Sequence, residues 1–258
     1  MNDRRASNEA TAALRHNLCN FPAMFAKSIS IGTADKFHNA TATLVDLGAG
    51  PLAITCAHVI ADYYEKWKAG TALIRIGNVS VSPSQLAGLD TDVDLATVRL
   101  SDEQAADLLR EDGLTVQFYQ PTRWPPEPAT VGESVALGGF PGQWRQRRPQ
   151  TRELLLGYYG IGATSVTAAS DRHFACQFER EHWIWMSRNA DFPDLTMLGG
   201  LSGGPVFAER HLHRALVGIV KEFPEGWDIM FISHAHWLQT DGSIRQDRPW
   251  PLRHAANV

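Results

Sequence analysis

The sequence has few cysteines, no long apolar run and no strong excess of charge of either sign. A formal net charge of -4 over 258 residues gives no general attraction to nucleic acid or to anionic membranes, so we expect neither as a partner. No stretch reaches the roughly 20 apolar residues that a membrane-spanning helix needs. The first residues also lack the apolar segment of a secretory signal. These absences favour a cytoplasmic protein.

The three cysteines, Cys19, Cys56 and Cys176, are an odd number and lack the spacing of a zinc site. In a protein that is not exported we expect them to be reduced and buried rather than bridged. Two histidine pairs, His211 with His213 and His234 with His236, have no accompanying cysteine or carboxylate motif. We therefore expect no metal and no cofactor.

Long amphipathic helices are also missing, which argues against alternating strands and helices. The chain instead consists mostly of short apolar runs, such as 52–55, 95–98 and 215–220, separated by Gly, Pro, Asp and Asn. This pattern predicts an all-β sandwich or barrel. One internal helix is expected from Asp102 to about Arg110, because Ser101 and Gln104 complete a capping box. The proline-rich stretch 121–128 cannot form a central strand and reads as a linker.

The most specific motif is the glycine-rich run 199–206, which reads Gly-Gly-Leu-Ser-Gly-Gly-Pro-Val around Ser202. A serine hydroxyl becomes a nucleophile when a base removes its proton and a rigid turn aims it. Flanking glycines let the backbone approach a substrate closely. They also let the N–H groups of Gly200 and Ser202 point together at a developing oxyanion. The alternative is a hairpin turn that carries an incidental serine.

Two upstream segments supply partners for such a serine. An apolar strand ends at His58, and imidazole is neutral near pH 7 and can act as a general base. Asp92 and Asp94 precede the apolar run 95–98, where a partly buried carboxylate can hold one imidazole tautomer. The residues alone separate the two aspartates poorly.

Together, the segments TCAHV, DLATV and GLSGGPV resemble the three signature blocks of chymotrypsin/trypsin-like serine peptidases, in the order His, Asp, Ser. The resemblance covers roughly residues 35 to 238. It implies an all-β fold of two six-stranded antiparallel β-barrels with few short helices. The expected division is an arm over 1–20, a first barrel over 21–125, a second barrel over 126–240 and a polar tail over 241–258.

The resemblance also implies roles for the motif residues. Ser202 would be the nucleophile, His58 the base and Asp94, rather than Asp92, its orienting acid. Members activated by proteolysis carry an aspartate before the serine to bind a newly cut amino terminus, whereas this chain has Leu201. The similarity is thus to bacterial members that need no such cleavage.

Specificity is less well defined by the resemblance. The floor of the primary pocket would come from Thr196, which carries no acid to attract a basic side chain. Lys221, Glu222 and Phe223 would lie beside the substrate backbone. Phe223 could narrow the pocket and Glu222 could attract a basic residue; the alternative is that these side chains point to solvent.

The sequence therefore predicts a serine endopeptidase that cleaves a protein or peptide substrate through an acyl-enzyme. A protease fold without catalysis, used for binding or sensing, is the alternative. The expected location and Leu201 are also compatible with an enzyme held latent by a regulatory protein partner, as in a bacterial defence or stress pathway.

Overall fold

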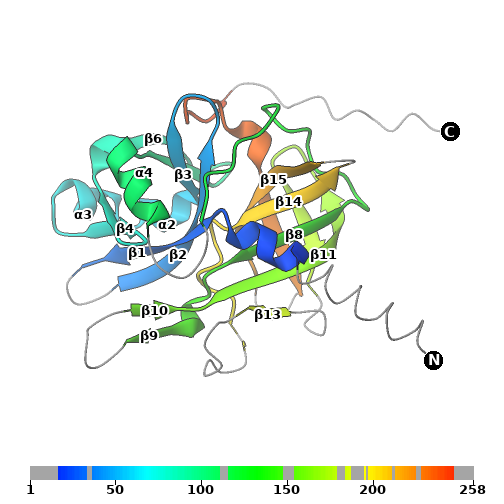
Figure 1. The fold of residues 1–258 in the computed structure, drawn as a ribbon, viewed down its shortest axis with the longest axis horizontal. Helices are drawn as coiled ribbons and strands as arrows, with labels where there is room; N and C mark the ends of the chain where they lie inside the picture. The colour runs from blue at the N-terminus through cyan, green and yellow to red at the C-terminus, as the bar shows by residue number, and fades with distance from the viewer. Residues whose placement is uncertain are drawn as a thin grey trace.

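Two antiparallel β-sheets lie side by side and contain all of the described strands except one short hairpin (Figure 1). The computed structural model describes residues 17–33, 37–110, 116–147, 154–178, 184–186, 195, 197–210, 213–224 and 228–246. The first sheet has the order β5-β4-β1-β2-β3-β7-β6. Its strands are β1 (Ala26–Gly32), β2 (Phe37–Asp46), β3 (Pro51–Thr55), β4 (Leu73–Ile76), β5 (Val79–Val81), β6 (Leu86–Asp90) and β7 (Leu95–Arg99).

The second sheet has the order β12-β16-β15-β14-β8-β11-β13, and a further pairing of β12 with β11 closes six of these strands into a barrel. Its strands are β8 (Ser134–Gly139), β11 (Tyr158–Ala169), β12 (His173–Gln177), β13 (Ile184–Met186), β14 (Pro205–Arg210), β15 (His213–Glu222) and β16 (Ile229–His234). A separate hairpin is formed by β9 (Arg145–Arg147) and β10 (Leu154–Leu156).

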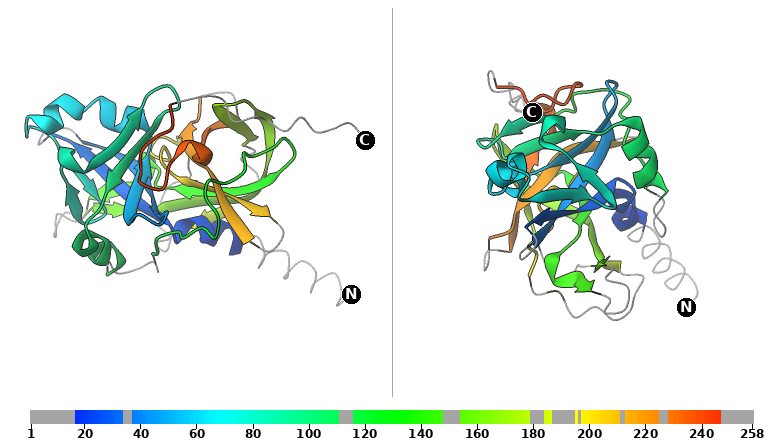
Figure 2. Two further views of the ribbon diagram at one scale, coloured as in Figure 1. Left: turned by 90° about the horizontal axis from the view of Figure 1, so that it is seen from above. Right: turned by 90° about the vertical axis from the view of Figure 1, so that its left-hand side faces the viewer.

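The predicted all-β double barrel is confirmed, and the two halves differ in closure. The second half is a closed six-stranded barrel with β13 added at one side. The first half is a curled sheet of seven strands, in which the end strands β5 and β6 are not paired with each other within the described residues. Figure 2 shows the two halves from two further directions.

Helices are short, as predicted. Residues 17–23 are helical, and the others are α2 (Ala57–Ala61), α3 (Tyr64–Lys68), α4 (Asp102–Leu109) and the 3₁₀ turns η1 (Pro83–Gln85), η2 (Gly142–Trp144) and η4 (Ala235–Trp237). The capping box of α4 is confirmed, because Ser101 Oγ accepts from Gln104 N and the Gln104 side chain accepts from Ser101 N. None of the helices in the described ranges is long and apolar enough to cross a membrane.

The alternation of side chains along each strand explains which residues are buried in the cores. In β4, the apolar Ile74 and Ile76 are buried, whereas Leu73 and Arg75 point outward, as a two-residue period requires. Each half buries its own apolar cluster. All three cysteines are buried and free, as predicted.

A third apolar cluster joins the two halves. Phe207 of β14 belongs to this cluster and is 2% exposed. Its ring centroid lies 5.4 Å from that of Phe25 and 5.1 Å from that of Tyr119. Tyr119 belongs to the segment that links the halves, and its hydroxyl donates to Arg214 O of β15 at 3.0 Å. Apolar packing and this hydrogen bond therefore fix the second barrel against the first sheet.

We expect Phe207→Ala to lower the free energy of unfolding by about 3–5 kcal/mol, because it leaves a cavity between the halves. Urea unfolding measures this. The matched control is Leu73→Ala, a large apolar side chain that is 66% exposed and should change the free energy by no more than about 0.5 kcal/mol. Equal effects of the two substitutions would contradict a buried contact between the halves.

Candidate active site

The candidate site lies at the part of β2 that the shorter strand β3 leaves unpaired. Strand β2 has 10 residues and β3 has 5. Their pairing runs only from Thr43 opposite Ile54 to Asp46 opposite Pro51. Beyond the end of β3, Thr41 N donates instead to Ser202 O at 2.9 Å. Ser202 is thus docked against the first sheet where β3 stops.

The two faces of β2 serve different halves of the molecule. Ala40, Ala42 and Leu44 are buried in the core of the first sheet. The alternate residues Asn39, Thr41 and Thr43 bond to loops of the second barrel. Side chains alternate across a strand. One face of β2 therefore packs in the core of the first sheet, and the other face binds loops of the second barrel.

Residues 199–203 are called the serine turn below. Each of their five carbonyl oxygens accepts a hydrogen bond. In chain order these oxygens accept from Gly142 N at 2.6 Å, Thr41 Oγ1 at 2.8 Å, Gly204 N at 2.9 Å, Thr41 N at 2.9 Å and Thr43 Oγ1 at 2.7 Å. Leu201 N and Gly203 N donate to Leu198 O and Val220 O. Within the described part of the chain, the remaining N–H groups of the turn, those of Gly199, Gly200 and Ser202, have no acceptor. Two of these three are the predicted oxyanion donors.

Two glycines of the motif are required by close packing. Gly200 and Gly203 have φ of +103° and +95°, which favour glycine. A Cβ on Gly203 would lie 1.9 Å from Thr41 O, and one on Gly200 would lie 2.6 Å from Phe140 O. The glycines on either side of Ser202 therefore allow the turn to lie directly against β2 and the end of β8.

Strand pairing also brings His58 and Asp94 together. In the antiparallel pair of β3 and β7, Thr55 lies opposite Ala96. The chain beyond Thr55 enters α2, which carries His58, while Asp94 precedes β7 by one residue. His58 Nδ1 lies 2.8 Å from Asp94 Oδ2 and 3.1 Å from Oδ1, and His58 N donates to Oδ1 at 2.9 Å.

The environment of this pair sets its protonation. The His58 side chain is 50% exposed and that of Asp94 is 7% exposed. The hydrogen bond to Asp94 raises the pKa of His58 above its usual value, although burial opposes the shift. The negative charges of Asp94, Glu222 and Asp62 raise this pKa further. Because an ionised carboxylate only accepts hydrogen bonds, Nδ1 carries the proton and Nε2 is left as the acceptor in the neutral ring.

The choice between the two aspartates follows from the geometry. Asp94 has φ of 56°, a left-handed conformation that aspartate tolerates better than most residues, and its carboxylate contacts His58. Asp92 is exposed, and its N–H donates to Asp90 Oδ1 at 2.8 Å. The structure thus brings Asp94, and not Asp92, to His58.

Cys56 is the residue beside this pair that could add a metal ligand. Its Sγ, a ring nitrogen of His58 and a carboxylate oxygen of Asp94 lie within 4.8 Å of one another. The Cys56 thiol donates to Val220 O at 3.0 Å. Burial, followed by the nearby charge of Asp94, raises its pKa well above the usual value. In this structure the thiol is therefore protonated and acts as a hydrogen-bond donor.

The predicted substrate-binding residues lie at the end of β15 and beyond it. Lys221 Nζ is 3.7 Å from Glu222 Oε1, and the Glu222 side chain is 56% exposed. Phe223 packs against the second barrel's core, with its ring centroid 5.1 Å from that of Phe178. Phe223 is thus packed rather than directed to solvent, whereas Glu222 is exposed and paired. Thr196 lies outside the described residues.

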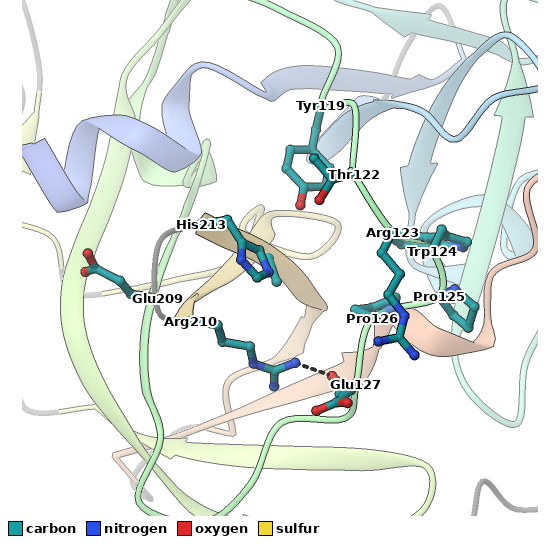
Figure 3. Close-up of a pocket in the computed structure, with 11 residues that line it drawn as sticks. Tyr119, Thr122, Arg123, Trp124, Pro125, Pro126, Glu127, Glu209, Arg210 and His213 are labelled. Carbon is teal, nitrogen blue, oxygen red and sulfur yellow. Dashed lines mark hydrogen bonds between the residues drawn. The ribbon is translucent and has the colours of Figure 1, made fainter.

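Other features stand apart from these residues. His234 and His236 are buried, and burial lowers their pKa values to about 4 and about 3; both are therefore neutral near pH 7. A hollow of about 650 Å³ lies between the proline-rich linker and the β14–β15 hairpin (Figure 3). Its lining includes Tyr119, Arg123 and His213, and none of the predicted site residues. His211 of the other histidine pair lies outside the described residues.

Comparison with known proteins agrees with this geometry. The family model of the trypsin-like peptidase domain matches residues 40–219, a range that contains His58, Asp94 and Ser202. The chain belongs to the trypsin-like peptidase family. No curated protein matches the sequence significantly.

Several solved structures are similar to this trypsin-like peptidase chain. The active form of the Rv3671c protease from M. tuberculosis has 16% identity and a TM-score of 0.43, with 85% of this chain and 80% of that chain covered. The thermostable serine protease AL20 from an extremophilic microorganism has 13% identity and a TM-score of 0.44, with 82% and 91% covered. An inactivated protease paralogue from the scabies mite has 16% identity and a TM-score of 0.48, with 85% and 92% covered.

The residues that hold the serine turn are not among those predicted from the sequence. Asn39, Thr41 and Thr43 contact it or its neighbour Phe140, and Gly142 donates to it. A signal for the threonines exists in the run Ala40-Thr41-Ala42-Thr43-Leu44, whose period of two gives one small apolar face and one polar face. A polar face on an interior strand indicates a partner, but the run does not say which partner.

We expect Asp94→Asn to lower the pKa of His58, because it removes the ionised acceptor of Nδ1–H. NMR titration of the His58 ring protons measures this without any substrate. The matched control is Asp62→Asn, which removes a weaker charge effect on His58 than that of Asp94 and should lower the pKa less. An unchanged or raised pKa in Asp94→Asn would contradict the assigned pair.

Proposed function

We propose that this chain is a serine endopeptidase and that Ser202, His58 and Asp94 are its catalytic triad. The observation that supports the proposal is that the structure contains two of the parts that such an enzyme needs. One is the His58–Asp94 pair of the first sheet, and the other is the docked serine turn of the second barrel. Together they offer a serine, a base, an orienting acid and two backbone donors, which are the parts needed for acyl transfer.

In the proposed reaction, Ser202 Oγ attacks the scissile carbonyl while His58 Nε2 takes its proton. His58 then gives this proton to the leaving amine, and water hydrolyses the acyl-enzyme by the same route. Within the described residues, neither Ser202 Oγ nor His58 Nε2 forms a hydrogen bond, which leaves both available to a substrate. Such bonds often tighten only when substrate binds.

Asp94 has two roles in this scheme. It holds the tautomer with the proton on Nδ1, and its charge stabilises the imidazolium that forms during attack. The raised pKa of His58 has a consequence for pH dependence, because only the neutral ring is a base. Activity is therefore present above the raised pKa and is lost as the pH falls through it.

The oxyanion of the tetrahedral intermediate would accept from Gly200 N and Ser202 N. These N–H groups belong to peptide units whose carbonyl oxygens, those of Gly199 and Leu201, are already bonded. Because C=O and N–H point in opposite directions across a trans peptide, fixing the carbonyl fixes the donor. Donors held in place before the reaction stabilise the developing charge without reorganisation.

Activation by a cut amino terminus is not part of this proposal. Leu201 is 1% exposed and packs in the core of the second barrel. A charged amino terminus would meet an apolar side chain there and no carboxylate of residue 201 to pair with. The proposed chemistry needs no metal or cofactor.

We expect a fluorophosphonate probe to label the wild-type protein and not Ser202→Ala, because the probe reacts with an activated serine. In-gel fluorescence measures the labelling. The matched control is Ser243→Ala, a serine near the end of the described chain, which should label normally. Labelling that survives Ser202→Ala would overturn the assignment, and a folded wild type that never labels would favour a binding protein with a protease fold.

We also propose that Phe223 limits the size of the substrate side chain, with Lys221, Glu222 and Thr196 as further substrate contacts. Phe223→Ala removes a ring that packs on Phe178. We expect the cleavage profile of a peptide library to extend to larger side chains beside the scissile bond. The matched control is Phe231→Ala, a half-buried phenylalanine whose ring lies against His173; the same broadening there would contradict the role of Phe223.

A further inference from the structure

Thr41 uses all of its polar groups on different segments around the serine turn. Its N–H donates to Ser202 O at 2.9 Å, and its carbonyl oxygen accepts from Thr55 Oγ1 at 2.9 Å. Its hydroxyl donates to Gly200 O at 2.8 Å and accepts from Phe140 N at 2.9 Å. Thr41 is 0% exposed, so water cannot replace any of these bonds.

The serine turn needs such external bonds because glycine contributes little rigidity. Gly199 and Gly200 are adjacent, and glycine populates positive and negative φ with similar ease. The direction of Gly200 N–H is therefore set by contacts outside the turn. Two contacts act on this residue and the one before it, namely Gly142 N to Gly199 O and Thr41 Oγ1 to Gly200 O.

The Thr41 hydroxyl joins these two contacts. By accepting from Phe140 N, it positions the segment that leads to Gly142, and by donating to Gly200 O it positions the turn itself. A Cβ added to Gly200 would lie 2.7 Å from Gly142 N and 2.6 Å from Phe140 O, which shows how closely the two segments approach. One hydroxyl thus sets the spacing between the turn and the loop that holds it.

We infer that Thr41 is a positioning residue for the oxyanion donors: a side chain of the first sheet that holds Gly200 N–H in the orientation the reaction needs. This inference rests on the proposed function. Within the described residues, the hydrogen bonds of Thr41 reach neither Ser202 Oγ nor His58 nor Asp94. Its loss therefore lowers the rate of the chemical step and leaves the pKa of His58 unchanged.

Thr41→Val tests the inference, because valine keeps the shape of threonine and removes the hydroxyl. Gly200 O and Phe140 N would lose a buried partner, which is costly. We expect the second-order rate of labelling by the fluorophosphonate to fall roughly 10- to 100-fold, less than the 10²–10³-fold typical of losing an oxyanion donor outright. The pH at which labelling is half-maximal should not change.

Two further variants separate positioning from general stability. Thr41→Ser keeps the hydroxyl and should label at close to the wild-type rate. Thr97→Val removes an equally buried threonine hydroxyl, which donates to Gly242 O far along the chain from the serine turn, and should also label normally. Normal labelling of Thr41→Val, or equal slowing of Thr41→Val and Thr97→Val, would overturn the inference.

A second measurement keeps this test separate from the proposed function. In protein labelled with ¹⁵N-glycine, the Gly200 amide resonance should move in Thr41→Val and stay in place in Thr97→Val. If the wild-type protein never reacts with the fluorophosphonate, the proposed function fails. The change in the Gly200 amide resonance then decides by itself whether Thr41 holds the serine turn. An unmoved Gly200 resonance in Thr41→Val would overturn the positioning role in either case.

Discussion

The hydrogen bond from Thr41 N to Ser202 O is the contact on which the candidate site depends. It exists because β3 is half the length of β2, so the edge of β2 is open where β3 ends. The serine turn is bound at this edge by that one backbone hydrogen bond and by the hydroxyl groups of Thr41 and Thr43. From the same end of β3 the chain enters α2, which carries the candidate base His58.

The site is consequently divided between the halves of the molecule. The first sheet supplies His58 and Asp94 and, through one face of β2, the side chains that hold the serine turn. The second barrel supplies Ser202 and the candidate oxyanion donors. The relative position of these parts depends on the shared apolar cluster that contains Phe207. It also depends on Gly200 and Gly203, because a side chain at either position would collide with the backbone of Phe140 or Thr41. Packing between the halves and the chemistry of the site are therefore linked.

The strands, helix α4 and the family could be predicted from the sequence, because each depends on a local pattern of residues. Short alternating runs predicted the strands, Ser101 and Gln104 predicted α4, and the three motifs predicted the family. The contact of Asp94 with His58 needed the register of β3 and β7, which no local pattern contains. Asn39, Thr41 and Thr43 were missed for the same reason, since their partners lie about 100 to 160 residues away. The first half's open, seven-stranded form depends on how short strands pair across the sheet, and the motifs do not specify it.

The proposed triad is tested most directly by a crystal structure of the protein after reaction with a fluorophosphonate. We expect a covalent bond from Ser202 Oγ to phosphorus, with the phosphonyl oxygen accepting from Gly200 N and Ser202 N and with His58 Nε2 nearby. An adduct on another residue would contradict the central claim. So would an adduct on Ser202 whose phosphonyl oxygen points away from these two N–H groups.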